Sequence, residues 1–339
     1  MKAVVTGGAG FIGSHLCDHL IAQGHTVTVV DDLSTGSMAN LAQLGEDPRF
    51  TFVQGDILDR ELVDGLVAEA DAMYHLAAAV GVYNIVDKPL RSLRINLHGT
   101  ENVVEAAVRH RVPYMVASTS EVYGKNDADG LTEDADRIYG PPTKSRWSYA
   151  AAKGLDELVA YVHGAESGVP CVITRFFNVV GPRQTGRYGM VVPRFVDQAL
   201  AGEPITVYGT GTQRRCFGSV FDVVPAMTRL MDTPQSFNRA VNLGGREEVS
   251  IKGLADRVVE LTGSDSAITF VDYEQAYGEG YEDMQRRFPD TSLAGELIGY
   301  EPTRDLDAII RSIVDHRGAA LDRPVPTAGP AAAAATAAV

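Results

Sequence analysis

The chain has 339 residues, of which 45% are hydrophobic and 22% are charged, a composition typical of a globular protein with a full core. Its formal net charge of −14 argues against a general binder of nucleic acid or membrane surfaces, so an anionic ligand would need a local arginine cluster. Cys17, Cys171 and Cys216 are widely spaced, which indicates reduced thiols in a cytoplasmic protein and no metal site. The N-terminus predicts a strand instead of a signal peptide, and no apolar run reaches the roughly 18 residues that span a membrane.

The first half of the chain alternates short β-branched runs with helical stretches. The runs predict strands over Ala3–Thr6, Thr26–Val30, Thr51–Gln54, Ala72–His75, Tyr114–Ala117 and Cys171–Thr174. The stretches between them predict helices near Phe11–Gln23, Arg60–Glu69, Leu90–Arg109 and Trp147–Glu166. This alternation predicts an α/β fold with a doubly wound parallel Rossmann sheet, whose ligands bind at the carboxyl ends of the strands.

Beyond Arg175, glycine and proline interrupt a series of short elements, which predicts a smaller lobe with ligand-binding loops. A helix near Asp222–Met231 and a strand near Ala240–Asn242 are expected to return to the main sheet. Two later helical stretches are expected, one that ends near Thr262 and one over Arg304–His316.

The predicted domains are therefore interleaved. We expect a dinucleotide-binding domain over residues 1–177, to which residues 219–247 return. Residues 178–218 and 248–316 form the smaller C-terminal, substrate-binding lobe in this prediction. The Pro/Ala-rich segment 323–339 is expected to be a flexible, solvated tail.

Glycines follow the first predicted strand directly, in the segment AVVTGGAGFIGSHL. In a strand–turn–helix unit, such glycines permit a tight turn and bring the backbone close to a pyrophosphate at the helix N-terminus. The segment fits both G-x-G-x-x-G and G-x-x-G-x-x-G, through Gly7, Gly8, Gly10 and Gly13. Asp31 ends the second strand, where a carboxylate binds the adenosine ribose and repels a 2′-phosphate. The sequence therefore predicts NAD as the cofactor, in preference to NADP.

Tyr149 and Lys153 lie four residues apart in a predicted helix, so their side chains share one face. A lysine ammonium beside a phenol favours the phenolate, so we expect the pKa of Tyr149 to fall towards neutrality. Such a phenolate could act as a base on a sugar hydroxyl next to a nicotinamide. Taken alone, the spacing also fits a chance pair on a solvated helix.

Further motifs accompany the glycine turn and Asp31 in a fixed order. They are Gly55-Asp56, HLAA at 75–78, Asn96 with Gly99-Thr100, STSEVYG at 118–124, YAAAK at 149–153 and RFFNVVGPR at 175–183. Over roughly residues 1–316 this set resembles the extended short-chain dehydrogenase/reductase family, the NAD-dependent nucleotide-sugar epimerases, dehydratases and decarboxylases. The resemblance implies that NAD stays bound, oxidises the sugar at C4 and is reduced transiently.

The resemblance also implies roles for individual residues. The cofactor would contact Gly7, Gly10, Phe11, Ile12, Gly13, Asp31, Ser34, Thr35, Gly36, Asp56, Ile57, Leu76, Ala77, Ala78, Asn96, Tyr149 and Lys153. The substrate would contact Thr119, Asn178, Arg183, Thr206, Tyr208, Arg215 and Arg287. Two arginines on a diphosphate give charge-assisted contacts, whereas surface ion pairing is the alternative reading of Arg215 and Arg287.

The residue types that follow Thr119 indicate which reaction of this family the chain resembles. Dehydratases carry an aspartate where this chain has Ser120, and a serine is a poor proton donor to a departing hydroxyl. Glu121, together with Arg287 before an aromatic-Pro-Asp step, is similar to the UDP-glucuronate decarboxylases, although Glu121 could also merely cap a turn. The resemblance then implies C4 oxidation, loss of CO2, and reduction to UDP-xylose or release of UDP-4-keto-pentose. The implied catalytic set is Thr119, Ser120, Glu121, Tyr149, Lys153 and Arg287.

Three positions depart from the family pattern and leave alternatives open. Phe221 stands where relatives commonly carry a second acid, and Gly218 and Ser219 replace larger residues. A 4-epimerase of a UDP-sugar or UDP-uronate is the main alternative. A non-catalytic, NAD-sensing scaffold is another, and the intact Tyr149 and Lys153 argue against it.

The expected partners are small molecules and a second copy of the chain. A UDP-sugar is the expected substrate, with UDP-glucuronate favoured, and neither nucleic acid nor membrane is an expected partner. The family implies a homodimer in which the helices near Leu90–Arg109 and Trp147–Glu166 form a four-helix interface.

Overall fold

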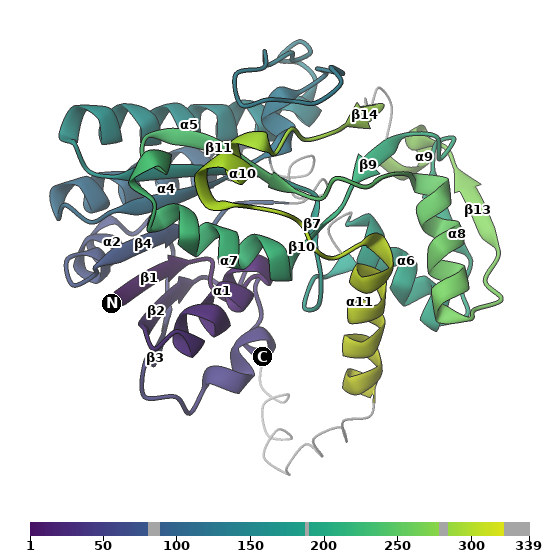
Figure 1. The fold of residues 1–339 in the computed structure, drawn as a ribbon, viewed down its shortest axis with the longest axis horizontal. Helices are drawn as coiled ribbons and strands as arrows, with labels where there is room; N and C mark the ends of the chain where they lie inside the picture. The colour runs from purple at the N-terminus through teal and green to yellow at the C-terminus, as the bar shows by residue number, and fades with distance from the viewer. Residues whose placement is uncertain (81–88, 187–189, 278–283, 322–339) are drawn as a thin grey trace, which may run out of the picture.

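A seven-stranded parallel sheet forms the centre of the larger lobe (Figure 1). The computed structural model describes residues 1–80, 89–186, 190–277 and 284–321. The strands of the sheet are β1 (Lys2–Thr6), β2 (Thr26–Asp31), β3 (Phe50–Gln54), β4 (Ala72–His75), β5 (Tyr114–Thr119), β6 (Cys171–Phe177) and β11 (Arg239–Gly244). Their order is β11-β6-β5-β4-β1-β2-β3, so the chain turns back at β1 and β4. The expected doubly wound α/β fold is confirmed, and the reversal places a ligand crevice at the ends of these strands.

Helices cover both faces of this sheet (Figure 1). One face packs against α1 (Phe11–Ala22), η1 (Met38–Leu44), α7 (Val220–Met231) and α10 (Ser292–Ile298). The other face packs against α2 (Arg60–Val67), α4 (Pro89–Arg109) and α5 (Ser148–Ser167). Short 3-10 turns complete the lobe at η2 (Ser120–Tyr123), η3 (Ser145–Trp147) and η5 (Pro234–Ser236).

The smaller lobe has its own apolar core, built around α6, α8 and α11. Its helices are α6 (Val191–Leu200), α8 (Ile251–Thr262), α9 (Tyr273–Tyr277) and α11 (Leu306–Leu321). Its small sheets contain β8 (Ile205–Tyr208), β9 (Arg214–Cys216), β12 (Glu248–Ser250), β13 (Ile268–Val271) and β14 (Arg286–Arg287). A two-stranded pairing of β7 (Val179–Val180) with β10 (Gly218–Ser219) follows β6 along the chain. The tail expected over 323–339 lies outside the described residues.

Two central strands are longer than their sequence patterns indicated. The strands β5 and β6 continue through Thr119 and Phe177, and Ser118 pairs in register with Arg175. The sequence-based prediction ended these strands before Ser118 and Arg175, because a strand buried on both faces normally consists of apolar residues and these two are polar. The helix expected near Trp147–Glu166 is α5, which begins at Ser148, and Trp147 ends the preceding turn η3.

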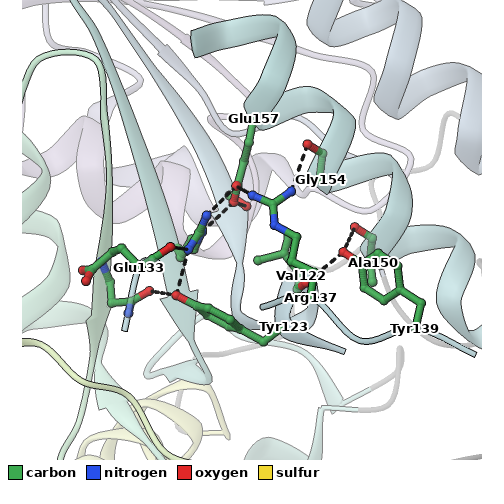
Figure 2. Close-up of polar contacts among 11 residues, drawn as sticks. Val122, Tyr123, Glu133, Arg137, Tyr139, Ala150, Gly154 and Glu157 are labelled. Atoms are coloured by element: carbon green, nitrogen blue, oxygen red, sulfur yellow. Dashed lines mark hydrogen bonds and ion pairs between the residues drawn. The ribbon is translucent and has the colours of Figure 1, made fainter. Parts of the chain in front are cut away.

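A buried carboxylate fastens α5 to those polar strand ends (Figure 2). Glu157, on α5, accepts hydrogen bonds from Ser118 Oγ at 2.5 Å and from Arg175 Nε and Nη2 at 2.9 and 2.8 Å. Arg137 also pairs with this carboxylate, and Arg175 Nη1 donates to Tyr123 Oη at 2.9 Å. The Glu157 side chain is 3% exposed, so its charge depends on these partners and not on water.

The three cysteines are buried and form no disulfide. Burial raises the pKa of Cys171 and Cys216 to about 12, so both are protonated thiols near neutral pH. Within the described parts of the chain, no helix is long and apolar enough to cross a membrane.

Removal of the Glu157 carboxylate should destabilise the protein strongly. A Glu157→Leu change leaves the Arg175 guanidinium buried without its anion, which costs about 3–5 kcal/mol of the free energy of unfolding. Urea titration followed by circular dichroism measures this loss. Glu166→Leu, at an exposed position on the same helix, is the control and should change stability little. Equal stability of the two variants would contradict the prediction.

The outer face of α5 is apolar and exposed, as a subunit interface requires. Leu155, Leu158 and Tyr161 are 50%, 55% and 49% exposed. We expect the homodimer to form here, so Leu158→Arg should give a monomer by light scattering at micromolar concentration. Phe270→Arg changes an equally exposed side chain on β13 and should leave the dimer intact. A monomeric unmodified protein would refute the dimer.

Candidate active site

A cavity of about 510 Å³ lies at the carboxyl ends of the central strands, with walls from both lobes. Its wall contains most of the residues singled out from the sequence. These are Gly7, Gly10, Phe11, Ile12, Gly13, Asp31, Ser34, Thr35, Asp56, Ile57, Leu76, Ala77, Ala78, Thr119, Ser120, Glu121, Tyr149, Lys153, Asn178, Arg183, Tyr208, Arg215 and Arg287.

Three of the expected contact residues lie behind the described wall of this cavity. Asn96 is buried, and its amide group accepts a hydrogen bond from the Ala79 backbone N–H at 2.8 Å. Thr206 accepts from Arg194 Nη1 at 2.8 Å and thereby holds a side chain that does line the cavity. Gly36 packs against the Asp31 side chain. A Cβ added to Gly36 would lie only 2.9 Å from Asp31 Oδ1. These residues support the wall and do not form it.

The glycine turn fits a dinucleotide because its backbone leaves no room for side chains. Gly7 has a φ of +70°, and a Cβ there would lie 2.6 Å from the backbone nitrogen of Ala77. A Cβ on Gly13 would lie 2.3 Å from the Gly7 carbonyl oxygen, so α1 can approach β1 closely only with glycine here. The N-terminus of α1 therefore opens onto the cavity, where its backbone N–H groups can bind a pyrophosphate.

Asp31 is held at the end of β2 by backbone groups on both sides. Its Oδ2 accepts from Ala9 N at 3.0 Å, and its Oδ1 accepts from Leu33 N at 2.8 Å. Burial raises the pKa of this carboxyl, while the two backbone hydrogen bonds lower it. The fixed carboxylate lines the cavity where an adenosine ribose would lie.

Tyr149 and Lys153 both line the cavity from the first two turns of α5. Burial raises the pKa of Tyr149 above its ordinary value, and the charges of Glu121 and Asp156 raise it further. The expectation of a lowered pKa was therefore wrong for the protein described here. The main physical reason is burial, which disfavours the phenolate. Lys153 Nζ, the group expected to favour it, donates to Asp156 Oδ2 at 2.9 Å.

Glu121 lies between two guanidinium groups. Arg146 Nη1 contacts Oε2 at 2.5 Å, and Arg287 Nη1 contacts Oε1 at 2.7 Å while it also donates to Ser120 Oγ at 3.0 Å. Burial opposes the charge on Glu121, but the surrounding arginines, Arg215 included, outweigh it and lower the pKa to about 2. Three guanidinium groups thus face one carboxylate, which leaves a positive field in this part of the cavity.

The hydroxyl of Thr119 is oriented by the turn that follows it. Thr119 caps η2, and its Oγ1 accepts from the Glu121 backbone N–H at 3.2 Å. Because that contact uses a lone pair of the oxygen, the O–H remains available to donate to a ligand in the cavity. Across the cavity, Asn178 has a φ of +38° and donates from Nδ2 to the Cys216 carbonyl at 2.8 Å.

The departures from the family pattern lie away from the described cavity wall. Phe221 contacts the ring of His15 edge to face, with 5.2 Å between the ring centroids. Ser219 caps α7 through its side chain. A Cβ on Gly218 would lie 2.9 Å from the backbone nitrogen of Gly245, so this glycine permits a close backbone contact. These three positions affect packing between segments, and the Gly218 N–H also donates to the carbonyl of Asn178 at 3.2 Å.

Sequence reasoning missed two arginines in the cavity wall. Arg146 pairs with Glu121, and its guanidinium lies 5.4 Å from the Trp147 ring centroid. Its place three residues before Tyr149 was the available signal. Arg194 lies over the ring of Tyr208, 4.0 Å from the centroid, and its position on a helix gave no signal. Both supply positive charge for an anionic ligand.

Comparison with known proteins agrees with this geometry. The NAD dependent epimerase/dehydratase family matches residues 3–244. A UDP-N-acetyl-alpha-D-glucosaminuronate decarboxylase of Bacillus cytotoxicus is 39% identical over 303 residues, which are 89% of this chain and 92% of that protein. A UDP-glucuronic acid decarboxylase 1 of Xenopus tropicalis is 36% identical over 308 residues, covering 90% and 69%. Among solved structures, the fold resembles that of a UDP-glucuronic acid 4-epimerase of Bacillus cereus in complex with UDP-glucuronic acid and NAD. The TM-score is 0.85 and the sequence identity is 28%, and the match covers 94% of this chain and 100% of that one.

Proposed function

Because the chain belongs to the NAD-dependent epimerase/dehydratase family, we propose that it is a decarboxylase that uses bound NAD, with UDP-glucuronate as its substrate. The observation that carries the proposal is the Glu121 carboxylate held between Arg146 and Arg287 in the cavity that contains Tyr149. A cluster of guanidinium groups at this point suits a sugar that itself carries a carboxylate.

The larger lobe would hold the cofactor along the ends of β1 and β2. The pyrophosphate would lie at the N-terminus of α1, and Asp31 would receive the hydroxyls of the adenosine ribose. Lys153 would hold the nicotinamide ribose. Bound NAD would supply hydride-transfer chemistry at C4 of the sugar.

Tyr149 and Thr119 would act on O4 of the sugar. Tyr149 would take the O4 proton as C4 is oxidised and return it on reduction. Thr119, whose oxygen already accepts from Glu121 N, would donate its O–H to O4 and polarise it. Both side chains line the cavity at the end of β5 and the start of α5, which allows them to reach one oxygen.

The arginine pocket would then act on the sugar carboxylate. Oxidation at C4 makes a β-keto acid, which loses CO2 as the electrons of the breaking bond flow into the C4 carbonyl. Arg287 would hold that carboxylate before it leaves, next to Ser120. With a pKa of about 2, Glu121 carries no proton near neutral pH. Glu121 would therefore orient the guanidinium groups and water, and a water near Ser120 would supply the proton that C5 needs.

Two other outcomes have specific support. A 4-epimerase remains the second candidate, because a UDP-glucuronic acid 4-epimerase shares this fold over 94% of the chain. A 2-acetamido uronate is the alternative substrate of the decarboxylase, as the name of the Bacillus cytotoxicus relative indicates. The reduced product, UDP-xylose, and the released UDP-4-keto-pentose are both compatible with the proposed residues.

The purified protein should carry NAD. Denaturation and chromatography of the released nucleotide measure this, and NADP as the main species would contradict it. Asp31→Asn removes the charge that repels a 2′-phosphate, so the preference for NAD over NADP should fall by about tenfold or more. Asp59→Asn is the control, because its carboxylate caps α2 through the Leu62 N–H and lies outside the described cavity wall.

Incubation with UDP-glucuronate should release CO2 and give a pentose nucleotide. Glu121→Gln keeps the side-chain shape and removes the charge that pairs with Arg146 and Arg287. We expect CO2 release to slow by roughly a hundredfold, while UDP binding stays within a few-fold. Mass spectrometry of the nucleotide and trapping of labelled CO2 give the two measurements.

Two comparisons make this test decisive. Tyr149→Phe should abolish C4 oxidation and leave UDP-sugar binding within a few-fold, because only the phenol proton is lost. If the protein decarboxylates UDP-2-acetamido-uronate but not UDP-glucuronate, the substrate is a 2-acetamido uronate. UDP-galacturonate without CO2 would overturn decarboxylation in favour of epimerisation.

A further inference from the structure

Arg287 lies in a short segment that is fastened on both sides. Its strand β14 pairs in parallel with β9, where Arg287 lies opposite Arg215. The residues that follow pair with the loop after η2. The Leu131 N–H donates to the Phe288 carbonyl at 2.8 Å, and the Asp290 N–H donates to the Leu131 carbonyl at 3.1 Å.

The buried side chain of Asn242, on β11, joins that segment to the turn that carries Glu121. Its Nδ2 donates to the Leu131 carbonyl at 2.8 Å and to the Asp290 carbonyl at 3.1 Å. Its Oδ1 accepts from Tyr123 Oη at 2.7 Å, and Tyr123 is the last residue of η2, two positions after Glu121. An amide suits this place because it offers one acceptor and two donor hydrogens.

The two segments that the amide joins also meet in the cavity. Arg287 Nη1 donates to Glu121 Oε1 at 2.7 Å and to Ser120 Oγ at 3.0 Å. The amide bonds the arginine segment three residues later, at Asp290, and it bonds the turn η2 at Tyr123. It therefore ties together, behind the cavity wall, the same segments whose side chains pair in that wall.

Arg287 keeps a donor for a ligand. Its side chain is 9% exposed and lines the cavity. Among the described residues, its Nε is buried and has no hydrogen-bond partner. A buried guanidinium N–H without a partner is costly, and the carboxylate of a bound sugar would satisfy it.

We infer that Asn242 is a positioning residue that fixes Arg287 against η2 and thereby sets the preference of the cavity for a UDP-uronate over a neutral UDP-sugar. This inference deepens the proposed function and rests on its assignment of a uronate as the substrate. Asn242 is not part of the described cavity wall, so its effect passes through Arg287. A guanidinium group binds a carboxylate through directed hydrogen bonds, so its displacement weakens the binding of the anion more than that of a neutral sugar.

The test compares the binding of two nucleotides that share UDP. UDP-glucuronate carries the carboxylate, and UDP-glucose has a hydroxymethyl group in its place. Calorimetric titration of the NAD-loaded protein gives both dissociation constants, and their ratio is the uronate preference. Every protein tested also carries Tyr149→Phe, which prevents conversion of the nucleotide during the titration.

Two variants remove contacts of the amide. Asn242→Leu removes all three hydrogen bonds, so the uronate preference should fall by about tenfold while UDP-glucose binding stays within a few-fold. Tyr123→Phe removes only the hydroxyl that donates to Asn242, so it should lower the preference less. Because Arg175 Nη1 keeps its bond to the Glu133 carbonyl, Tyr123→Phe is the milder variant and serves if Asn242→Leu does not fold.

Tyr300→Phe is the matched control. The buried Tyr300 hydroxyl donates to the Gly244 carbonyl of β11 at 3.1 Å. This bond lies on the same strand as Asn242 but does not join it to the segment of Arg287. The uronate preference of this variant should therefore stay within about twofold of its parent.

Arg287→Ala shows whether Asn242 acts through the arginine. In that background, Asn242→Leu should change the preference no further, because two changes that act through one contact are not additive. A further fall there overturns the inference. So does an unchanged preference, or an equal loss of both nucleotides, in Asn242→Leu and Tyr123→Phe.

Failure of the proposed function gives a different result. The parent protein, with Tyr149→Phe alone, would then bind UDP-glucose as tightly as UDP-glucuronate. That outcome removes the uronate as substrate, and the inference falls with it. A parent that prefers the uronate, with variants that keep this preference, overturns the role of Asn242 alone.

Discussion

The position of α5 relative to the central sheet depends on the buried carboxylate of Glu157. It joins the helix to β5 through Ser118 and to β6 through Arg175. The helix bears Tyr149 and Lys153, and β5 ends at Thr119, so the same contact helps to fix the position of Tyr149 relative to Thr119, the two groups proposed to act on one oxygen. A buried charge with four donors tolerates little displacement, because loss of one partner leaves an unpaired ion.

The network around Glu157 also extends to the segment just after Arg287. Tyr123 Oη, which accepts from Arg175, donates to Asn242 Oδ1 at 2.7 Å on β11. Asn242 Nδ2 in turn donates to the carbonyls of Leu131 and Asp290, close in sequence to Arg287. This set of polar contacts thus links β5, β6 and β11 to the segment that follows Arg287.

Oppositely charged side chains are paired in and beside the cavity wall. Glu121 is paired with arginines, which lower its pKa to about 2, and Lys153 is paired with Asp156. A protein with a net charge of −14 thus gathers Arg146, Arg215 and Arg287 in the wall of one cavity, where a carboxylate or diphosphate could bind. Short-range pairing achieves this, because the field of the whole molecule has the opposite sign.

The sequence by itself determined the parallel sheet, the glycine turn and the side chains that face the cavity from strand ends, since each follows from local spacing. Gly7, Gly13 and Asp31 are examples, because a turn and a strand end need no distant partner to be identified. Only the tertiary structure decided which charges meet. Arg146 and Glu121 are 25 residues apart, and the polar ends of β5 and β6 could form strands only once Glu157 satisfied them. The pKa of Tyr149 had the wrong sign in the sequence-based prediction for the same reason: spacing identifies the neighbouring lysine, but burial and the other partner of that lysine are properties of the folded chain.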